Sequence, residues 1–107
     1  MNIGKAIKEL RNEKGLNQRE LAAECGLTQT SLSQIESGAK RPNPGTLKKL
    51  CKYFKLPEPA LYILATEVTD VPVEKQQLYQ SLFPNIRNLM LDLFRTEHDR
   101  EDIRENS

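Results

Sequence analysis

The sequence predicts an all-α protein made of a five-helix domain followed by a C-terminal helical extension. Strand signals, such as runs of alternating β-branched residues or tight hairpin turns, are missing from its 107 residues. Helix-capping residues instead recur at short intervals before apolar residues with helical spacing. We assign residues 1–65 to the domain, 66–72 to a linker and 73–107 to the extension.

The domain is predicted to start with two helices, each bounded by a capping residue and a glycine. Asn2 can cap the first helix, and Gly15 ends it. Asn17 can cap the second helix, and Glu20 stands three residues later, where a capping box has its acidic residue. Gly26 then ends this second helix.

Three further helices follow by the same signals. Thr28 can cap the third helix, which covers about residues 28–37. The fourth has Pro44 in its first turn, where the missing N–H costs no hydrogen bond. A fifth short helix is expected at residues 58–65. The apolar positions that we expect to form the inner faces of the first four helices are Ile3, Ile7, Leu10, Leu21, Ala22, Cys25, Leu32, Ile35, Leu47, Leu50, Cys51 and Phe54.

The second and third helices carry a resemblance to a known family. The turn between them, Gly26-Leu27-Thr28, is so short that it forces the two helices to cross steeply. The matching segments are Leu16-Asn17-Gln18-Arg19-Glu20-Leu21-Ala22, then GLTQTSLSQIESG from Gly26 to Gly38, and Arg41-Pro42-Asn43-Pro44-Gly45-Thr46-Leu47. In this order and spacing, residues 3–65 resemble the lambda-repressor/Cro-like helix-turn-helix family, also called XRE. The alternative is an ordinary small helical bundle.

The resemblance implies that the helix of about residues 28–37 lies in the major groove of double-stranded DNA. It puts Gln29, Thr30, Ser33 and Gln34 against base edges. A glutamine amide can pair with both N6 and N7 of adenine, and a threonine methyl group can contact thymine. The alternative role for each of the four is a solvated helix surface.

Polar residues at both ends of the motif are expected to contact phosphates, which position a protein without reading sequence. The resemblance places Gln18 and neighbouring backbone amides against a phosphate at a helix N-terminus. The full set is Asn17, Gln18, Arg19, Ser37, Lys40 and Arg41. We expect Glu36, in contrast, to be structural and to pair with a basic residue such as Arg11.

The charge distribution agrees with DNA binding but does not require it. Residues 1–55 hold 11 Lys and Arg against 5 Glu, a net charge of +6. Residues 56–107 hold 5 Lys and Arg against 10 Asp and Glu, a net charge of −5. Such asymmetry is typical of proteins with a basic binding surface, although an unevenly charged solvated surface is the alternative.

The extension has a wide apolar stripe with helical spacing between residues 74 and 97. Because Pro84 interrupts the stripe, we expect two helices or a kink near Phe83-Pro84, with Pro84 opening the second helix. Residues 99–107 are charged and expected to fray. We expect the stripe to form a homodimer interface, and the alternative is a helix folded back on its own domain. The interface residues would be Leu78, Leu82, Phe83, Ile86, Leu89, Met90, Leu93 and Phe94.

These observations favour a cytoplasmic, dimeric, DNA-binding transcriptional regulator, a repressor rather than an activator. The rival reading is an antitoxin-like or adaptor protein whose C-terminal helices bind a partner protein. An enzyme is not expected, because His98 stands alone and no phosphate-binding loop or nucleophile motif appears. We expect no metal or cofactor, no membrane span and no signal segment, and two buried reduced thiols at Cys25 and Cys51.

Overall fold

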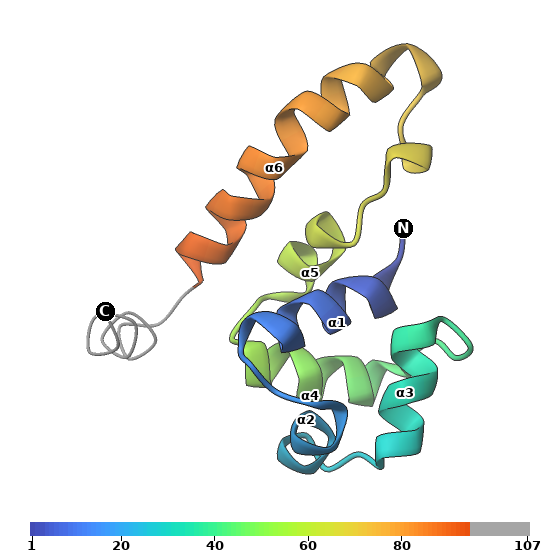
Figure 1. The fold of residues 1–107 in the computed structure, drawn as a ribbon, viewed down its shortest axis with the longest axis vertical. Coiled ribbons are helices and arrows are strands. Elements are labelled where there is room, and N and C mark those ends of the chain that lie inside the picture. The colour runs from blue at the N-terminus through green and yellow to red at the C-terminus, as the bar shows by residue number, and fades with distance from the viewer. Residues whose placement is uncertain (95–107) are drawn as a thin grey trace.

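The computed structural model describes residues 1–94, and within them every regular element is helical (Figure 1). The α-helices are α1 (Ile3–Glu13), α2 (Gln18–Glu24), α3 (Gln29–Ser37), α4 (Pro44–Phe54), α5 (Glu58–Leu64) and α6 (Gln76–Leu93). Two short 3-10 turns, η1 (Val68–Asp70) and η2 (Val73–Lys75), connect α5 to α6. The all-α class is confirmed, and all five helices predicted for the domain are present. The predictions for His98 and for the fraying of residues 99–107 lie outside the described residues.

Asparagine side chains cap the N-termini of α1, α2 and α4. The Oδ1 atoms of Asn2 and Asn43 each accept a hydrogen bond from the backbone N–H three residues later, at 3.0 and 2.8 Å. Asn17 and Glu20 form the predicted capping box, because each side chain accepts a hydrogen bond from the backbone N–H of the other residue. These caps satisfy amide groups that have no partner inside the helix.

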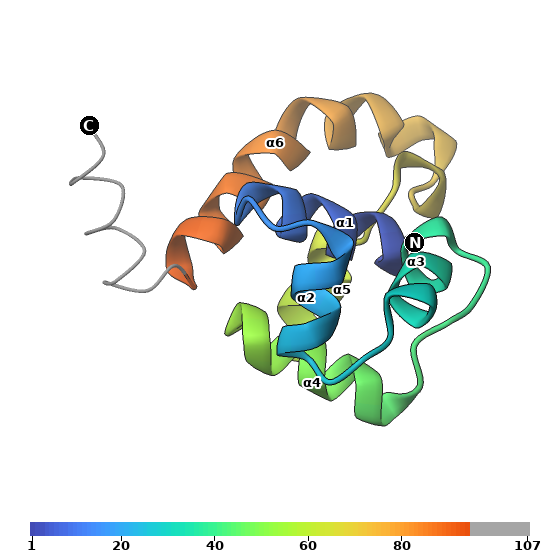
Figure 2. The same cartoon turned by 60° about the horizontal axis from the view of Figure 1, so that its bottom comes forward.

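The hydrophobic core lies between the first five helices, and each contributes one fully buried large side chain. These are Ile7, Leu21, Leu32, Leu50 and Leu61. Helix α1 packs against α3 and α5, α2 packs against α3, and α4 packs against α5 (Figure 2). Of the twelve predicted inner-face residues, Ile3 is half-buried and the others are buried. The buried residues of the core end at Ala65, and Met90, Leu91 and Phe94 of α6 pack against them.

Helix α6 is one continuous helix, so the prediction of two helices separated at Pro84 is wrong. Pro84 lies inside α6 on its solvent side, where water can reach the carbonyl group that loses its N–H partner. Residues on both sides of Pro84, such as Tyr79 and Met90, hold the same helix against the domain. The expected kink at this proline stays a prediction.

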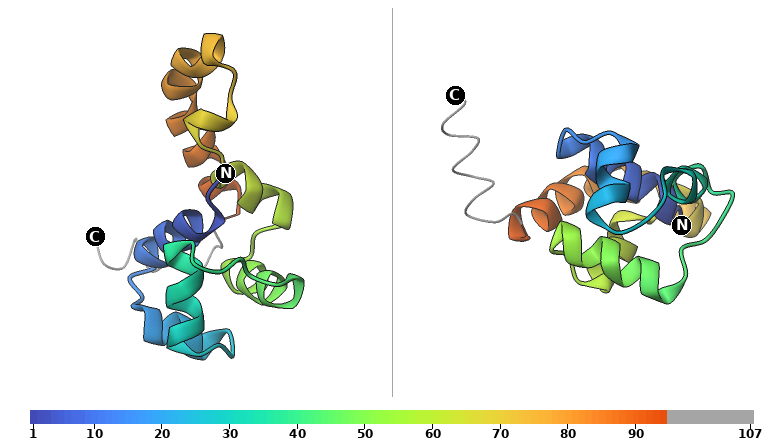
Figure 3. Two further views of the ribbon diagram at one scale, coloured as in Figure 1. Left: turned by 90° about the vertical axis from the view of Figure 1, so that its right-hand side faces the viewer. Right: turned by 90° about the horizontal axis from the view of Figure 1, so that it is seen from below.

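One side of α6 packs on the domain, as the alternative interpretation of the stripe foresaw. The hydroxyl group of Tyr79 donates a 2.6 Å hydrogen bond to the carbonyl oxygen of Thr66. The Nη2 atom of Arg87 lies 2.8 Å from an oxygen of Glu13 and 3.6 Å from one of Glu9 in α1. In two directions of view, α1 lies between α6 and α3 (Figure 3). Helix α6 and the predicted recognition helix therefore occupy opposite sides of the molecule.

Candidate nucleic-acid interface

Helices α2 and α3 form a helix-turn-helix whose turn is built by a glycine and a threonine. Gly26 has a φ of +66°, a left-handed conformation that glycine adopts without strain. The N–H of Leu27 then donates to the carbonyl oxygen of Ala22 at 2.8 Å, which closes the end of α2. Thr28 caps α3 by accepting a 3.0 Å hydrogen bond from the N–H of Ser31. This turn fixes where α3 starts and which of its faces is turned outward.

The four residues predicted to contact bases share the outer surface of α3. Gln29, Thr30 and Ser33 are exposed and Gln34 is half-buried. Their side chains make no hydrogen bond or ion pair with any of residues 1–94. The opposite side of α3 is buried in the core through Leu32, Ile35 and Glu36. Helix α3 thus exposes a row of polar side chains to solvent, while its opposite side packs in the core.

A buried ion pair connects α1 to the inner side of α3. The guanidinium of Arg11 in α1 donates to both carboxylate oxygens of Glu36 in α3, at 2.8 and 3.0 Å. Its third contact is a 2.7 Å hydrogen bond to the carbonyl oxygen of Leu16. The hydrogen bonds to Glu36 raise the pKa of the Arg11 guanidinium. The expected structural role of Glu36 and its pairing with Arg11 are therefore confirmed.

The same carboxylate also holds Gln18, a residue that we expected to contact a phosphate. The Nε2 atom of Gln18 donates a 3.1 Å hydrogen bond to Oε1 of Glu36. A glutamine amide has two N–H groups, so one donor remains for a phosphate. The bond to Glu36 fixes the direction of this remaining donor. Residues 18 and 36 lie far apart in the sequence, and neither helical spacing nor the capping pattern pointed to this contact.

Two other residues that were predicted to contact phosphates make hydrogen bonds within the protein. The Oδ1 atom of Asn17 caps α2, which leaves its amide nitrogen as the free donor. The hydroxyl proton of Ser37 is donated to the carbonyl oxygen of Gln34 at 3.1 Å. Because a serine hydroxyl has one proton, Ser37 in this arrangement can offer none to a phosphate.

The remaining predicted phosphate contacts are exposed cations on either side of α3. Arg19 lies in the first turn of α2, and Lys40 and Arg41 lie in the loop that follows α3. The backbone N–H of Lys40 donates to the carbonyl oxygen of Gln34 at 3.1 Å, which ties this loop to the end of α3. Exposed cations beside an uncharged row of polar side chains are suited to a polyanion.

Metal and thiol chemistry are not indicated in the described part of the chain. Residues 1–94 contain no group of three His, Cys, Asp or Glu side chains able to hold a metal ion. Cys25 and Cys51 are free and buried, and burial raises the pKa of both thiols, so that they stay protonated near neutral pH. Among these same residues, no helix is long and apolar enough to cross a membrane.

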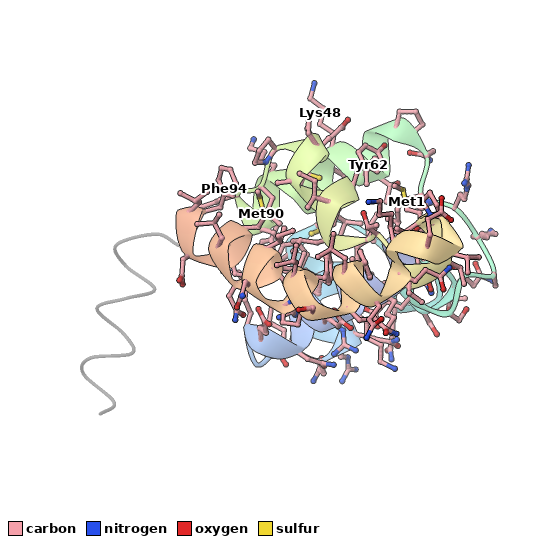
Figure 4. The ribbon with its side chains drawn as sticks, turned by 90° about the horizontal axis from the view of Figure 1, so that it is seen from above. Met1, Lys48, Tyr62, Met90 and Phe94 are labelled. Carbon is pink, nitrogen blue, oxygen red and sulfur yellow. The ribbon has the colours of Figure 1, made fainter. Side chains whose placement is uncertain are left out.

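The eight residues predicted to form the dimer interface fall on two different sides of α6. Met90 and Phe94 lie at its C-terminal end and pack against the domain core, on the side of Tyr62 in α5 (Figure 4). Phe83 is half-buried, and its ring stacks on that of Tyr79 with centroids 4.8 Å apart. The other five are exposed to solvent, and we call them the outer stripe: Leu78, Leu82, Ile86, Leu89 and Leu93.

Sequence reasoning missed the residues that anchor α6 to the domain. Arg87 could have indicated which side of the helix meets the domain. It is the one basic residue between Gln76 and Leu93, so an acidic partner on the domain was a reasonable expectation. Tyr79 gave a weaker signal of the same kind, since a tyrosine at the edge of an apolar stripe commonly has a hydrogen-bond partner for its hydroxyl group.

Comparison with known proteins agrees with this geometry. A helix-turn-helix family model matches residues 7–61. The HTH-type transcriptional regulator RghRB of Bacillus subtilis, which is described as uncharacterized, is 32% identical over 85 residues, covering 76% of this chain and 61% of that protein. The HTH-type transcriptional repressor RghR of the same organism is 32% identical over 71 residues, covering 65% of this chain and 53% of the repressor.

A third relative, the HTH-type transcriptional regulator PuuR of Escherichia coli, is 42% identical over 53 residues, covering 50% of this chain and 29% of PuuR. The chain thus spans less than two thirds of the length of these relatives, and none of the three names denotes an enzyme. No solved structure matches. With the family model spanning more than half of its length, the chain belongs to the lambda-repressor/Cro-like (XRE) helix-turn-helix family.

Proposed function

We propose that this protein binds double-stranded DNA sequence-specifically by inserting α3 into the major groove. The observation that carries the proposal is the row of four polar side chains on the outer surface of α3, which have no partner within residues 1–94. Unpaired amide and hydroxyl groups on a fixed helix can exchange their water for the donors and acceptors of base edges.

Gln29 and Gln34 are the proposed main determinants of sequence preference. Each amide offers one acceptor and two donors, which match N6 and N7 of an adenine in the major groove. Thr30 and Ser33 add a methyl or hydroxyl contact between them. Because α3 carries no basic residue, affinity has to come from cations outside it, and Arg19, Lys40 and Arg41 are placed to supply it.

The biological role we propose is transcriptional regulation, with repression as the more direct mechanism. A protein that covers its site needs no contact with polymerase to block it, whereas an activator needs a second surface for that contact. The names of the relatives RghRB, RghR and PuuR support the regulatory role, and that of RghR supports repression.

We also propose that the protein binds DNA as a homodimer, assembled through α6. Proteins of this type read two half-sites related by twofold symmetry, one half-site for each recognition helix. Since Met90, Phe94 and Phe83 face the chain's own domain, we narrow the proposed interface to the outer stripe. A different protein bound to the same stripe, as in an antitoxin or adaptor, is the competing proposal, and sedimentation of the purified chain separates the two.

Alanine substitutions in α3 test the DNA-binding proposal. Gln29→Ala and Gln34→Ala should each cost about 1–3 kcal/mol of binding free energy on the best natural site, because the paired base loses its partner. Asn12→Ala, which removes an exposed amide side chain from α1, is the matched control and should bind like the parent protein. Fluorescence anisotropy with a labelled duplex gives all three affinities. Equal affinity for the parent and both α3 variants would contradict the assignment of the recognition helix.

A further inference from the structure

One strip of the exposed surface of α6, from Leu78 to Leu93, is apolar, and exposed polar residues flank it. The five side chains of the outer stripe are 40 to 62% exposed, although each is Leu or Ile. A contiguous apolar surface of this kind on a soluble domain marks an interaction site. We infer that the outer stripe binds the outer stripe of a second copy of this chain, with the two α6 helices antiparallel. This inference rests on the proposed dimer and adds the surface and the direction of the helices.

Charge on α6 favours an identical partner over a different one. Helix α6 has two charged residues, Arg87 and Asp92, and Arg87 is turned toward α1 of its own domain. The exposed polar residues that flank the stripe along most of α6 are uncharged: Gln77, Gln80, Ser81, Asn85 and Asn88. Interfaces that select a different partner commonly use complementary charges, and like charges oppose self-association. Between Leu78 and Leu89 the exposed surface of α6 has neither feature and is suited to a second copy of itself.

The residues of this sequence that follow α6 are mostly charged. Of its residues after α6, the thirteen from 95 to 107 include eight Arg, Asp or Glu. Ile103 is their one large aliphatic side chain. One large aliphatic side chain is too few to pair with five exposed Leu and Ile side chains, whereas a second copy of α6 offers five.

The spacing of the stripe matches an antiparallel pair. Leu78 and Leu93 lie equally far from the midpoint between Asn85 and Ile86, and so do Leu82 and Leu89. A twofold axis through this midpoint, perpendicular to the helix, places Leu78 opposite Leu93 of the other copy and Leu82 opposite Leu89. Each leucine then meets a leucine, and the two Ile86 side chains meet near the axis.

The position of α6 in the molecule allows this pairing while DNA is bound. Helix α1 separates α6 from α3, so the outer stripe and the recognition surface face different directions (Figure 3). Tyr79 and Arg87 fix α6 to its own domain, and the pairing of two α6 helices therefore fixes the arrangement of the two domains. A defined arrangement is what two half-sites at a fixed spacing require.

Disulfide cross-linking of variants with one added cysteine tests the pairing. The variants are Leu82→Cys, Ile86→Cys and Leu89→Cys in the full chain, and the parent, whose two cysteines are buried, is the control. All three sites are exposed, and circular dichroism confirms that each variant keeps its helix content. In an antiparallel pair, residue 82 lies about 10 Å along the helix from residue 82 of the other copy, too far for a disulfide.

We expect Ile86→Cys to cross-link with itself, and Leu82→Cys to cross-link only when mixed with Leu89→Cys. Each of the latter two should stay uncross-linked alone. Self-linking of both Leu82→Cys and Leu89→Cys would overturn the antiparallel arrangement while the dimer stands. A dimer in sedimentation without any cross-link would overturn the stripe as the interface. A monomeric parent would overturn the inference and the dimer together, and anisotropy with DNA would still report whether α3 binds.

Discussion

Residues 1–65 and helix α6 are both helical and both rich in leucine, yet they relate to the core in different ways. Each of α1 to α5 places a large side chain completely inside the domain, whereas α6 contains no buried residue. The largest fully buried side chains of the core therefore all come from α1 to α5. Helix α6 is held to it by one side, and its other side is suited to a second molecule. Leucines with the same helical spacing are thus buried in one region and exposed in the other.

Two arginine ion pairs, one in the domain and one between α6 and α1, show the same contrast. The side chains of Arg11 and Glu36 are 10 and 2% exposed, and the pair joins α1 to α3. Those of Arg87 and Glu13 are 26 and 42% exposed, and the pair joins α6 to α1. A buried pair is costly to break because one charge stays buried without a partner, while water replaces a lost partner at the surface.

Removing each arginine should therefore have very different effects on stability. Arg11→Ala should lower the free energy of unfolding by about 3–5 kcal/mol, because Glu36 is left charged inside the domain. Arg87→Ala should cost no more than about 1 kcal/mol. Urea denaturation followed by circular dichroism measures both. Similar losses for the two variants would show that α6 belongs to the core as much as α1 does.

Shortening a leucine in each region makes the same comparison for apolar contacts. Leu50 is fully buried and Leu89 is 54% exposed. Leu50→Ala should cost about 2–5 kcal/mol, because it leaves a cavity in the core. Leu89→Ala should change the stability of the dilute monomer by no more than about 0.5 kcal/mol. The same variant should shift sedimentation toward monomer at higher concentration. A Leu89→Ala protein as unstable as Leu50→Ala would contradict the division between core and outer stripe.

Two glycines test how closely the helices of the domain approach one another. A Cβ atom at Gly4 in α1 would overlap the carbonyl oxygen of Ile35 in α3, so Gly4→Ala should cost about 1–3 kcal/mol and move α3. At Gly45 in α4, the nearest atom to a Cβ would be Oδ1 of Asn43 at 3.4 Å. Gly45→Ala should therefore leave stability unchanged or raise it by about 0.4–1 kcal/mol. Thermal unfolding ranks the variants, and a harmless Gly4→Ala would refute the tight crossing of α1 and α3.

The smallest expected effects concern the exposed cations near α3. Lys40→Ala and Arg41→Ala should each lower the slope of log affinity against log salt concentration by about one unit, without changing the preferred sequence. Lys75→Ala, in η2 beside α6, is the matched control and should leave this slope unchanged. Titrations of one duplex at several salt concentrations provide the slopes. An altered base preference would assign Lys40 or Arg41 to a base instead.

Much of the domain could be predicted from the sequence because its signals are local. Asn2, Asn17, Thr28 and Asn43 each cap a helix through a contact within three residues, and a sequence shows such contacts directly. Contacts between distant segments left weaker signals. The bond between Gln18 and Glu36 was missed for this reason, although the pairing of Glu36 with Arg11 was predicted.

The extension was harder to predict because only part of its apolar stripe packs on the domain. Its spacing showed that Leu78 to Phe94 had to be covered, but not which residues the chain's own domain would cover. The break predicted at Pro84 was wrong because packing against the domain on both sides of the proline keeps the helix continuous.

Selection of bound duplexes from a random DNA pool tests the central claim most directly. The full-length parent should enrich an inverted repeat, because two α3 helices related by a twofold axis read the same bases on opposite strands. Gln29→Ala, selected from the same pool, should enrich a repeat of the same spacing that has lost its preference at one symmetric base pair in each half-site. A parent protein that enriches no sequence, or a Gln29→Ala motif identical to that of the parent, would contradict base recognition by α3.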